Sequence, residues 1–575
     1  MTRKSDEPGA RKGFLGTLNS DVAPRVFWPA AGFIVAFVGV AMIWPEDMYR
    51  AMMEIQGWIV RWFGPYYTVV VTGFVAFSLW VGLGRYGDIK LGKDDDEPEF
   101  SLVSWFTMLF AAGMGIGLVF WGVAEPLNHL AGIPNRASGV EIMDEQGAQA
   151  ALVQTFLHWG LHPWATYVVV GLAIAYAVHR KGHPVSIRWT LKPLLGNRIN
   201  GWAGDLVDIV AVVGTLFGVA TSLGLGVIQI GAGLSVLDVV GENPGNLLYV
   251  VLIGAITLLA VASVFTGLKK GIKLLSNVNI GLAGAVLLFV LFAGPTLFLF
   301  RHFIQSIGQY LQELLRHSFD TTAMHGDAGT TWQSWWTAFY WAWWISWASF
   351  VGVFIARISK GRTIRQFVAA VLIVPTMLTL LWFTVLGGTA TNHELSDEGS
   401  LVARGPNGGA LLDANGVNIS VDNDSSLFQL LETLPGGTIL AGFAIIAIVL
   451  FFVTSSDSGS LVVDMLASGG DPNPPVWSRI FWGTAEGVVA VALLTAGGES
   501  SLTALRYTAI VIAFPFSIVM LLMCWASLRE FKAERQLMHA IRLKHQHEEL
   551  TERLREQGQL KSDDRDISDP TTSRE

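Results

Sequence analysis

The sequence predicts an all-α membrane protein with twelve transmembrane helices, and three observations support this class. Of the 575 residues, 52% are hydrophobic and only 15% are charged, whereas soluble proteins carry about 25% charged residues. The mean hydropathy of +0.47 leaves too little polar surface to cover soluble domains of this size. Apolar runs long enough to cross a bilayer also recur along the whole chain.

The composition excludes several other classes. The single cysteine, Cys524, rules out a disulfide framework within the chain and a cysteine-based metal site. A net charge of −8 gives no global basic field for nucleic acid. The first 25 residues are rich in charged side chains and hold no apolar core, so we expect no cleaved signal peptide. We find no H-E-x-x-H, P-loop or G-x-S-x-G motif, and therefore do not expect an enzyme.

The twelve predicted spans follow from the length of helix that a bilayer needs, about 20 mostly apolar residues. They are 26–45, 64–84, 102–124, 150–178, 205–237, 245–267, 276–300, 334–357, 365–390, 435–466, 477–497 and 504–528. A membrane domain over 26–528 then lies between a tail at 1–25 and a C-terminal region at 529–575. Within that region, 529–557 is predicted to be a polar helix and the hydrophilic end to be disordered.

The basic residues predict the orientation. With twelve spans, the basic loops after spans four, six and eight share one side with both tails, and the opposite loops are poorer in Lys and Arg. The loop residues are Arg180, Lys181, Arg188, Lys192, Arg198, Lys269, Lys270, Lys273, Arg357, Lys360, Arg362 and Arg365. Because cytoplasmic loops carry the excess of Lys and Arg, both termini are expected in the cytoplasm. The chain is thus expected to be a multi-pass protein of the cell (inner) membrane.

Residues 301–320 predict an amphipathic helix between spans seven and eight. Apolar residues recur there at helical spacing, opposite a polar face of Arg and Gln. The apolar positions are Ile304, Ile307, Leu311, Leu314 and Leu315. Such a helix lies along the membrane interface.

Three glycines in the middle of the third span predict an interruption of that helix. Gly113, Gly115 and Gly117 alternate with Met114 and Ile116. Glycine often serves close helix packing in membranes, but residues at i, i+2 and i+4 do not share one helix face. An unwound segment explains the pattern better, because it frees carbonyl oxygens for a cation and N–H groups for an anion. Broken helices of this kind mark binding sites in secondary transporters.

Aromatic residues are concentrated in spans four and eight. An interfacial aromatic belt accounts for Trp332, Trp335 and Trp336. It does not account for the deeper Trp343, Trp344 and Trp347.

In span four, Trp159, Trp164 and Tyr167 fit one broad helix face. Such a face alone is more typical of a packed core. Combined with the tryptophans of span eight, it suggests an aromatic cage. Aromatic faces attract quaternary ammonium ions by about 2 kcal/mol or more when the contact is desolvated.

A run of five polar residues, Thr454–Ser458, interrupts the tenth span. Hydroxyl groups in membrane helices often bond back to a carbonyl of their own helix. Five consecutive polar residues are nevertheless too many for a lipid-facing stretch, so we expect them to face a cavity. Hydroxyl oxygens are suitable ligands for a small hard cation.

Two of these segments carry a family resemblance. Gly113–Gly117 continue into Leu-Val-Phe-Trp-Gly-Val-Ala-Glu-Pro. Phe339–Gly352 read Phe-Tyr-Trp-Ala-Trp-Trp-Ile-Ser-Trp-Ala-Ser-Phe-Val-Gly and lead into Ala-Arg-Ile-Ser-Lys-Gly-Arg-Thr-Ile-Arg at 356–365. Over about residues 25–530 the chain resembles the betaine–choline–carnitine transporter family, most of all its sodium-coupled glycine betaine transporters.

The resemblance implies a specific architecture. Spans three to seven (102–300) and eight to twelve (334–528) form two inverted five-helix repeats, with 26–84 as two peripheral helices. Helices three and eight are broken and face each other, and the helix at 301–320 helps members to assemble as trimers. No cofactor is implied other than sodium as the coupling ion.

The resemblance also implies site residues. The family's aromatic box corresponds to Trp159, Trp164, Tyr167 and Trp344. Neighbouring substrate contacts correspond to Trp343, Trp347, Met114 and Ser222, where Ser222 meets the substrate carboxylate. The sodium site corresponds to Ala111, Met114, Phe451, Thr454 and Ser455.

A second sodium site is only partly matched. Thr215 and Phe350 correspond to two of its ligands, but Val219 replaces the remaining threonine and cannot coordinate a cation. Proton-coupled choline carriers have an acidic residue at the position of Gly117. Glycine there favours sodium coupling and a zwitterionic substrate. Glu125, the nearest acid, is expected to be mostly structural.

The expected function is sodium-coupled import of glycine betaine or a related compatible solute, as osmoprotection. Two alternatives stay open. One is a carrier for choline, carnitine, ectoine or dimethylsulfoniopropionate with different coupling. The other is a membrane sensor that binds such ligands without transporting them.

Overall fold

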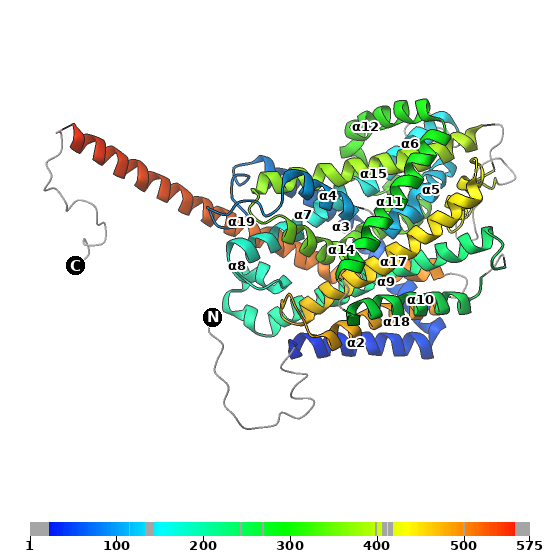
Figure 1. Cartoon of the computed structure of the whole chain (residues 1–575), viewed down its shortest axis with the longest axis horizontal. Coiled ribbons are helices and arrows are strands. Elements are labelled where there is room, and N and C mark those ends of the chain that lie inside the picture. The colour runs from blue at the N-terminus through cyan, green and yellow to red at the C-terminus, as the bar shows by residue number, and fades with distance from the viewer. Residues whose placement is uncertain are drawn as a thin grey trace, which may run out of the picture.

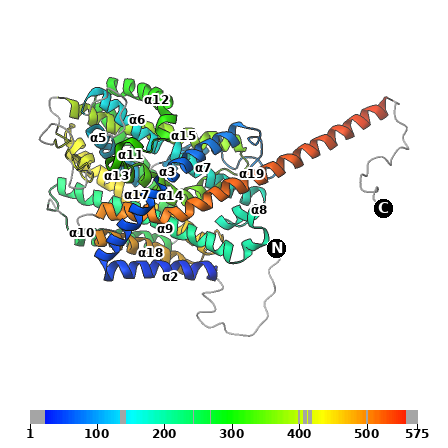
Figure 2. The same cartoon turned by 180° about the vertical axis from the view of Figure 1, so that it is seen from behind.

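A computed structural model describes residues 22–557, except 114, 133–142, 242–243, 267–268, 397–399, 405–410, 412–417 and 498–500. The described chain is mostly helical, and Lys90 and Thr363 form an isolated bridge. Its helices pack side by side in one bundle, from which the end of the last helix projects (Figures 1 and 2). Residues 1–21 and 558–575, which include most of the predicted N-terminal tail and the predicted disordered end, lie outside the described residues.

The helices of the first half have these bounds: α2 Pro24–Ile43, α3 Pro45–Leu83, α4 Leu102–Gly113, α5 Ile116–Ala131, α6 Glu145–Trp159, α7 Leu161–Ala175, η1 Tyr176–Arg180, η2 Ile187–Leu191, α8 Lys192–Leu195, η3 Gly196–Asn200, α9 Trp202–Val236, α10 Asn246–Thr266 and α11 Lys269–Ala293. Those of the second half are α12 Thr296–Ser318, η4 Ala323–His325, α13 Gly326–Trp335, α14 Thr337–Ile358, α15 Ile364–Leu395, α16 Ser426–Glu432, α17 Gly437–Ala467, α18 Val476–Gly497 and α19 Ser501–Glu556.

Helices occupy all twelve predicted spans. Among the described residues, ten helices are long and apolar enough to cross a membrane. The other two predicted spans correspond to α10, whose apolar stretch is shorter, and to the interrupted pair α4 and α5. The structure therefore supports a multi-pass membrane protein, and the count of twelve stays a prediction.

The third span is interrupted where the glycines predict it. α4 ends at Gly113 and α5 begins at Ile116, and Gly115 between them is fully extended, with φ −163° and ψ 176°. Met114 lies outside the described residues. The extended backbone removes intrahelical hydrogen bonds at this level, as an unwound segment requires.

The eighth predicted span, 334–357, is interrupted near its start. Residues 343–352 are continuous helix, because α14 runs from Thr337 to Ile358. The chain leaves helical geometry earlier, at Trp336 between α13 and α14, where φ is −119° and ψ is −86°. α14 packs extensively against α7.

A further interruption, in the fourth span, was not predicted. α6 ends at Trp159 and α7 begins at Leu161, with Gly160 at φ −90° and ψ −121° between them. The free N–H of Leu161 donates to the hydroxyl of Tyr310 at 3.1 Å. Tyr310 belongs to α12, so a side chain from outside the span satisfies the backbone group that the break releases.

α12 covers the predicted amphipathic segment. It packs against α6 and α15 through Ser306, Tyr310 and neighbouring buried residues. The predicted apolar residues Ile304, Leu311 and Leu315 are instead more than half exposed, at 72%, 59% and 73%. An exposed apolar row of this kind suits contact with lipid or with another protein chain.

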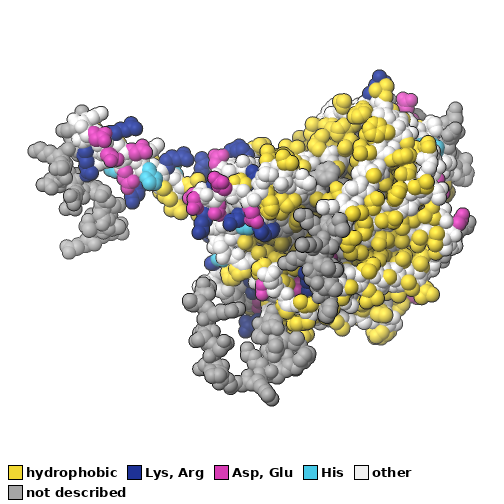
Figure 3. All heavy atoms as spheres, in the orientation of Figure 1, with side chains coloured by type: hydrophobic (Ala, Val, Ile, Leu, Met, Phe, Trp, Pro, Cys, Tyr) yellow, Lys and Arg dark blue, Asp and Glu magenta, His cyan; other side chains and the backbone are white. Residues whose placement is uncertain are grey.

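α19 changes character along its length. Its first half packs in the bundle against α9, α14 and α3. The rest extends beyond the bundle and carries mixed basic, acidic and histidine side chains, in contrast to the apolar sides of the bundle (Figure 3). The predicted helices 504–528 and 529–557 are thus one continuous rod. Glu534 attaches this rod to the end of the fourth span by accepting from Arg180 Nε at 3.0 Å.

Candidate functional site

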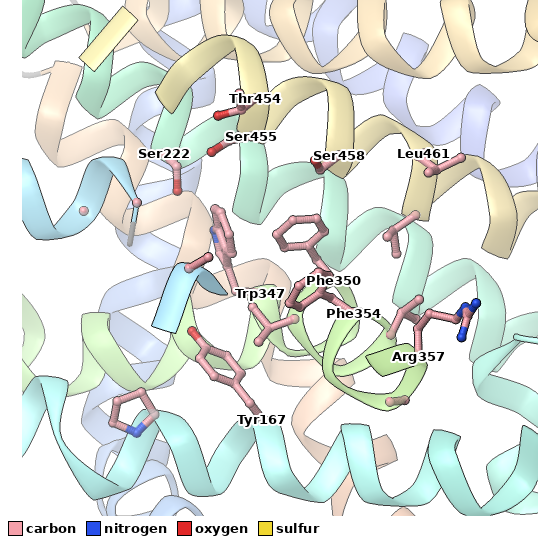
Figure 4. Close-up of a pocket in the computed structure, with 18 of the residues that line it drawn as sticks. Tyr167, Ser222, Trp347, Phe350, Phe354, Arg357, Thr454, Ser455, Ser458 and Leu461 are labelled. Carbon is pink, nitrogen blue, oxygen red and sulfur yellow. The ribbon is translucent and has the colours of Figure 1, made fainter. Parts of the chain in front are cut away.

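The helices enclose a cavity of about 560 Å³ between the interrupted third span, α7, α14 and α17. Most of the predicted site residues line this one cavity. They are Trp159, Trp164, Tyr167, Trp343, Trp344, Trp347, Ser222, Phe350, Ala111, Gly115, Gly117, Phe451, Thr454 and Ser455. Figure 4 shows Tyr167, Trp347 and Phe350 on one side of it and the hydroxyl groups of Thr454, Ser455 and Ser222 on another.

The aromatic rings meet mostly edge to face. The ring centres of Trp159 and Trp344 are 4.8 Å apart, with an angle of 70° between the planes. Trp164 and Tyr167 are 5.3 Å apart at 82°, and Tyr167 and Trp344 are 6.5 Å apart at 80°. Rings of α6 and α7 are thereby set nearly perpendicular to those of α14. Walls that meet at right angles present several π faces to one volume, which suits a rounded cation.

Hydrogen bonds hold four of the indoles in place. Trp159 Nε1 donates to Glu125 Oε2 at 2.7 Å, and Trp344 Nε1 donates to the carbonyl of His158 at 2.9 Å. The indole N–H groups of Trp343 and Trp347 donate to Ser222 Oγ and to the carbonyl of Gly218. An indole has a single N–H donor. Because each donor is used at the edge of the cavity, the rings are fixed before a ligand arrives and their faces stay free.

Gly117 is required by the tryptophans that pack on it. A Cβ atom at this position would lie 2.6 Å from the Trp343 ring and 3.0 Å from the Trp159 ring. Real Cβ atoms do not approach other atoms so closely. An acidic side chain at position 117 would therefore need both rings to move, so the glycine and the ring arrangement belong together.

The described members of the predicted sodium site come from α4 and α17. Ala111, Phe451, Thr454 and Ser455 line the cavity, and Met114 lies outside the described residues. The hydroxyl of Thr454 donates to the carbonyl of Leu450 at 2.8 Å, which leaves lone pairs on its oxygen for a cation. Asn279, oriented with its amide nitrogen toward Ala447, bridges the Ala447 carbonyl and the Phe451 N–H.

The residues of the second sodium site are less well placed. Phe350 lines the cavity, whereas Thr215 does not and donates its hydroxyl to the carbonyl of Ala211 at 2.7 Å. Val219 is 1% exposed and packs against α17, where a Cβ atom on Gly459 would meet it at 2.9 Å. Of the three positions, only Phe350 therefore faces the cavity.

The polar run of the tenth span divides between two environments. Thr454, Ser455, Asp457 and Ser458 line the cavity, and Asp457 pairs with Arg479 at 3.1 Å. Ser456 points elsewhere and donates to the buried Glu486 at 3.1 Å. The expectation that all five face a cavity thus holds for four of them.

The cavity also has residues that the sequence did not reveal. It continues past Phe354 to Arg357 (Figure 4), and His179 and Pro472 line the same end. Arg357 and His179 belong to the basic ends of spans eight and four, so the cavity extends toward the end of the bundle that carries the basic loops. Phe354 and Arg357 belong to α14, His179 to η1 and Pro472 to the segment after α17, so no local motif brings them together.

Comparison with known proteins shows the family of the chain. Residues 25–536 match the model of the betaine/carnitine/choline family of transporters. The glycine betaine transporter OpuD of Bacillus subtilis is 43% identical over 89% of this chain and 95% of its own. Glycine betaine transporter 1 of Vibrio parahaemolyticus is 42% identical over 90% and 95%. The ectoine/glycine betaine/proline transporter EctP of Corynebacterium glutamicum is 39% identical over 89% and 80%. The relatives are named as transporters rather than enzymes, and the chain belongs to the betaine/carnitine/choline transporter family.

Proposed function

We propose that this protein imports glycine betaine or a closely related compatible solute together with sodium. The observation that carries the proposal is the cage of Trp159, Trp164, Tyr167 and Trp344, which lines the cavity beside the interrupted third span. A trimethylammonium group cannot donate an ordinary N–H hydrogen bond, so aromatic faces are the natural contact for it. Relatives named for glycine betaine transport, at 42–43% identity, support this choice of substrate.

The cation and the carboxylate of the substrate would bind to different parts of the site. The ammonium head sits against the rings, and the carboxylate meets N–H groups freed at Gly115 and the hydroxyl of Ser222. In the structure that hydroxyl oxygen accepts from Trp343 and lies 3.3 Å from the Gly218 carbonyl. Binding a carboxylate therefore requires the Ser222 hydroxyl proton to turn toward the ligand.

Sodium would bind between Ala111 and Met114 on the third span and Phe451, Thr454 and Ser455 on α17. There it would hold the interrupted span against α17 in the geometry that completes the cage. Substrate binding and sodium binding then assist each other, because each orders backbone that the other uses.

Transport would follow by alternating access. The cavity extends from the cage toward the end of the bundle with the basic loops, which suits a state open to the cytoplasm. Twelve helices in two inverted repeats, cytoplasmic termini, an inner-membrane location and a trimer complete the proposal. One sodium ion moving down 100 mV contributes about 2.3 kcal/mol. A tenfold sodium gradient adds about 1.4 kcal/mol, so one ion supports roughly 500-fold accumulation.

The test is uptake of labelled substrates by proteoliposomes that contain the purified protein. We expect saturable glycine betaine uptake under an inward sodium gradient and little uptake when potassium replaces sodium. Labelled choline, carnitine and ectoine run in parallel identify the preferred substrate. Choline uptake that follows a proton gradient and ignores sodium would overturn the coupling. Binding of glycine betaine without any flux would identify a sensor.

A further inference from the structure

Glu125 is a buried carboxylate directly behind the aromatic cage. It lies in α5, eight residues after Gly117, and is completely buried. Oε2 accepts from the indole N–H of Trp159 at 2.7 Å and from the hydroxyl of Tyr340. Oε1 is 2.6 Å from Nδ1 of His158 and 3.2 Å from Nε2 of His129. Four side chains from α5, α6 and α14 therefore converge on one carboxyl group.

The hydrogen bonds fit an ionised Glu125 between two neutral histidines. An indole N–H only donates, and an ionised carboxylate only accepts. With its proton on Nδ1, His158 donates to Glu125, and its Nε2 can accept from Thr337 Oγ1 at 3.0 Å. His129 likewise donates from Nε2. Each oxygen of Glu125 then accepts two hydrogen bonds, the number that its lone pairs allow. A proton on Oε2 would instead face the indole N–H of Trp159, which can only donate.

Glu125, His129 and His158 have the composition of a metal site, and their ligand atoms lie within 4.8 Å of one another. The 2.6 Å contact between Glu125 and His158 is nevertheless a hydrogen bond. Ligand atoms that share a tetrahedral zinc ion at bonds of 2.0–2.1 Å lie about 3.3 Å apart. The geometry thus favours a hydrogen-bonded anion over metal coordination.

No described lysine or arginine is bonded to this anion. Arg506 of α19, which interacts with Glu125 through charge alone, lies among aromatic rings, 4.4 Å from the centre of Trp335 and 4.8 Å from that of Trp121. Within the described part of the chain, none of its guanidinium nitrogens has a hydrogen-bond partner. The negative charge of Glu125 is therefore stabilised by hydrogen bonds from neutral donors. One of these donors, Trp159, belongs to the cage, so the charge acts electrostatically on the cage.

We infer that Glu125 is a specificity-determining residue, which makes the cage select a permanently cationic head over a neutral one of the same shape. The carboxylate bonds to the edge of the Trp159 indole, whose ring is part of the cage wall. An anion at the N–H edge increases the negative charge on the π face, and it also attracts the ligand's cation directly through a medium of low dielectric. Burial of the three methyl groups, by contrast, contributes equally to the binding free energy of charged and neutral heads. The inference rests on the proposed function.

The test compares glycine betaine with its carbon isostere, tert-butylacetate, which has the same shape and carboxylate but no positive charge. Both compete with labelled glycine betaine for uptake into proteoliposomes under an inward sodium gradient, and the ratio of their inhibition constants is measured. We expect Glu125→Gln to lower the preference for glycine betaine about tenfold, because the glutamine keeps the shape and removes the charge. Glu125→Asp should retain most of the preference.

Glu394→Gln is the matched control. Glu394 is also a buried acid, 1% exposed, but it binds the backbone N–H groups of Leu401 and Val402 in a loop. Its substitution should leave the ratio unchanged. If Glu125→Gln does not fold, Trp159→Phe replaces it, since phenylalanine keeps a π face but lacks the N–H that meets Glu125. That variant should lose several-fold in preference.

The outcomes are separable from those of the proposed function. If the wild-type protein binds neither compound, the proposed function fails. If it prefers glycine betaine and Glu125→Gln weakens both compounds equally, Glu125 only supports the fold and the inference is overturned. An unchanged ratio in the variant overturns it as well.

Discussion

The guanidinium carbon of Arg506 lies 4.4 Å from the ring centre of Trp335. The same group is 4.9 Å from the centre of Phe339 and 5.3 Å from that of Trp336. Arg506 of α19 thus contacts one ring of α13, one ring of α14 and the ring of Trp336 between the two helices. These rings lie at the end of the cage away from Arg357. Cation–π contacts, rather than ion pairs, join the last helix to the aromatic layer.

Arg506→Lys tests whether these contacts stabilise the bundle. Lysine keeps the positive charge but loses the planar surface that stacks on several rings. We expect the free energy of unfolding to fall by about 1–2 kcal/mol, measured by thermal denaturation in detergent. Arg535→Lys, at an exposed position of the same helix, is the control and should change little. Equal stability of both variants would show that the rings contribute nothing.

Asp424 predicts a pH dependence of stability. Burial, with a contribution from Asp422, raises the pKa of Asp424 to about 7, although Arg506 opposes the shift. Its unfolded pKa is about 3.9. Between these values the folded chain holds a proton that the unfolded chain releases, so this contribution to stability is complete at low pH and is lost as pH rises through about 7.

Asp424→Asn should therefore flatten the pH profile and make the protein more stable than the wild type at about pH 8. Thermal denaturation across the pH range measures both effects. Asp327→Asn, which changes an exposed acid, is the control and should retain the wild-type profile. A slope that survives in Asp424→Asn would assign the titration to another group.

Trp344→Leu tests the cage. Trp344 contributes a ring 4.8 Å from Trp159, and leucine fills part of the space without a π face. We expect the affinity for glycine betaine to fall about 30-fold, the equivalent of about 2 kcal/mol. Quenching of tryptophan fluorescence by glycine betaine, in sodium and in potassium, measures the change. Trp344→Phe should lose less affinity, because phenylalanine keeps a π face. If Trp344→Leu and the wild-type protein bind glycine betaine equally well, the substrate binds elsewhere.

Val219→Thr tests the number of sodium ions. Threonine has nearly the shape of valine, so it fits against Gly459 and adds one hydroxyl group. If the native protein uses a single sodium ion, the variant should show a steeper dependence of uptake on sodium concentration. Uptake rates over a sodium titration measure this, with Thr215→Val as the variant that removes the neighbouring hydroxyl. An unchanged slope would mean that no second site forms around position 219.

Local sequence patterns predicted most of the fold. Apolar length alone located the helices, because a bilayer demands about 20 apolar residues per span wherever the span lies in the chain. Gly113, Gly115 and Gly117 predicted the interruption of the third span for a similarly local reason, since closely spaced glycines weaken a helix by themselves. The aromatic residues of spans four and eight predicted which side chains line the cavity.

Only the tertiary structure decided how those rings are held. At the Gly160 interruption, the N–H group of Leu161 donates to the hydroxyl of Tyr310, which lies 149 residues further along the chain. The role of Glu125 depends on Tyr340, 215 residues away, and on Trp159, 34 residues away. A buried polar group must find its partners among whatever the fold brings near it. Contacts between residues so far apart in the chain produce no local pattern in the sequence. The match to the thickness of a bilayer, by contrast, requires a run of apolar residues in every span.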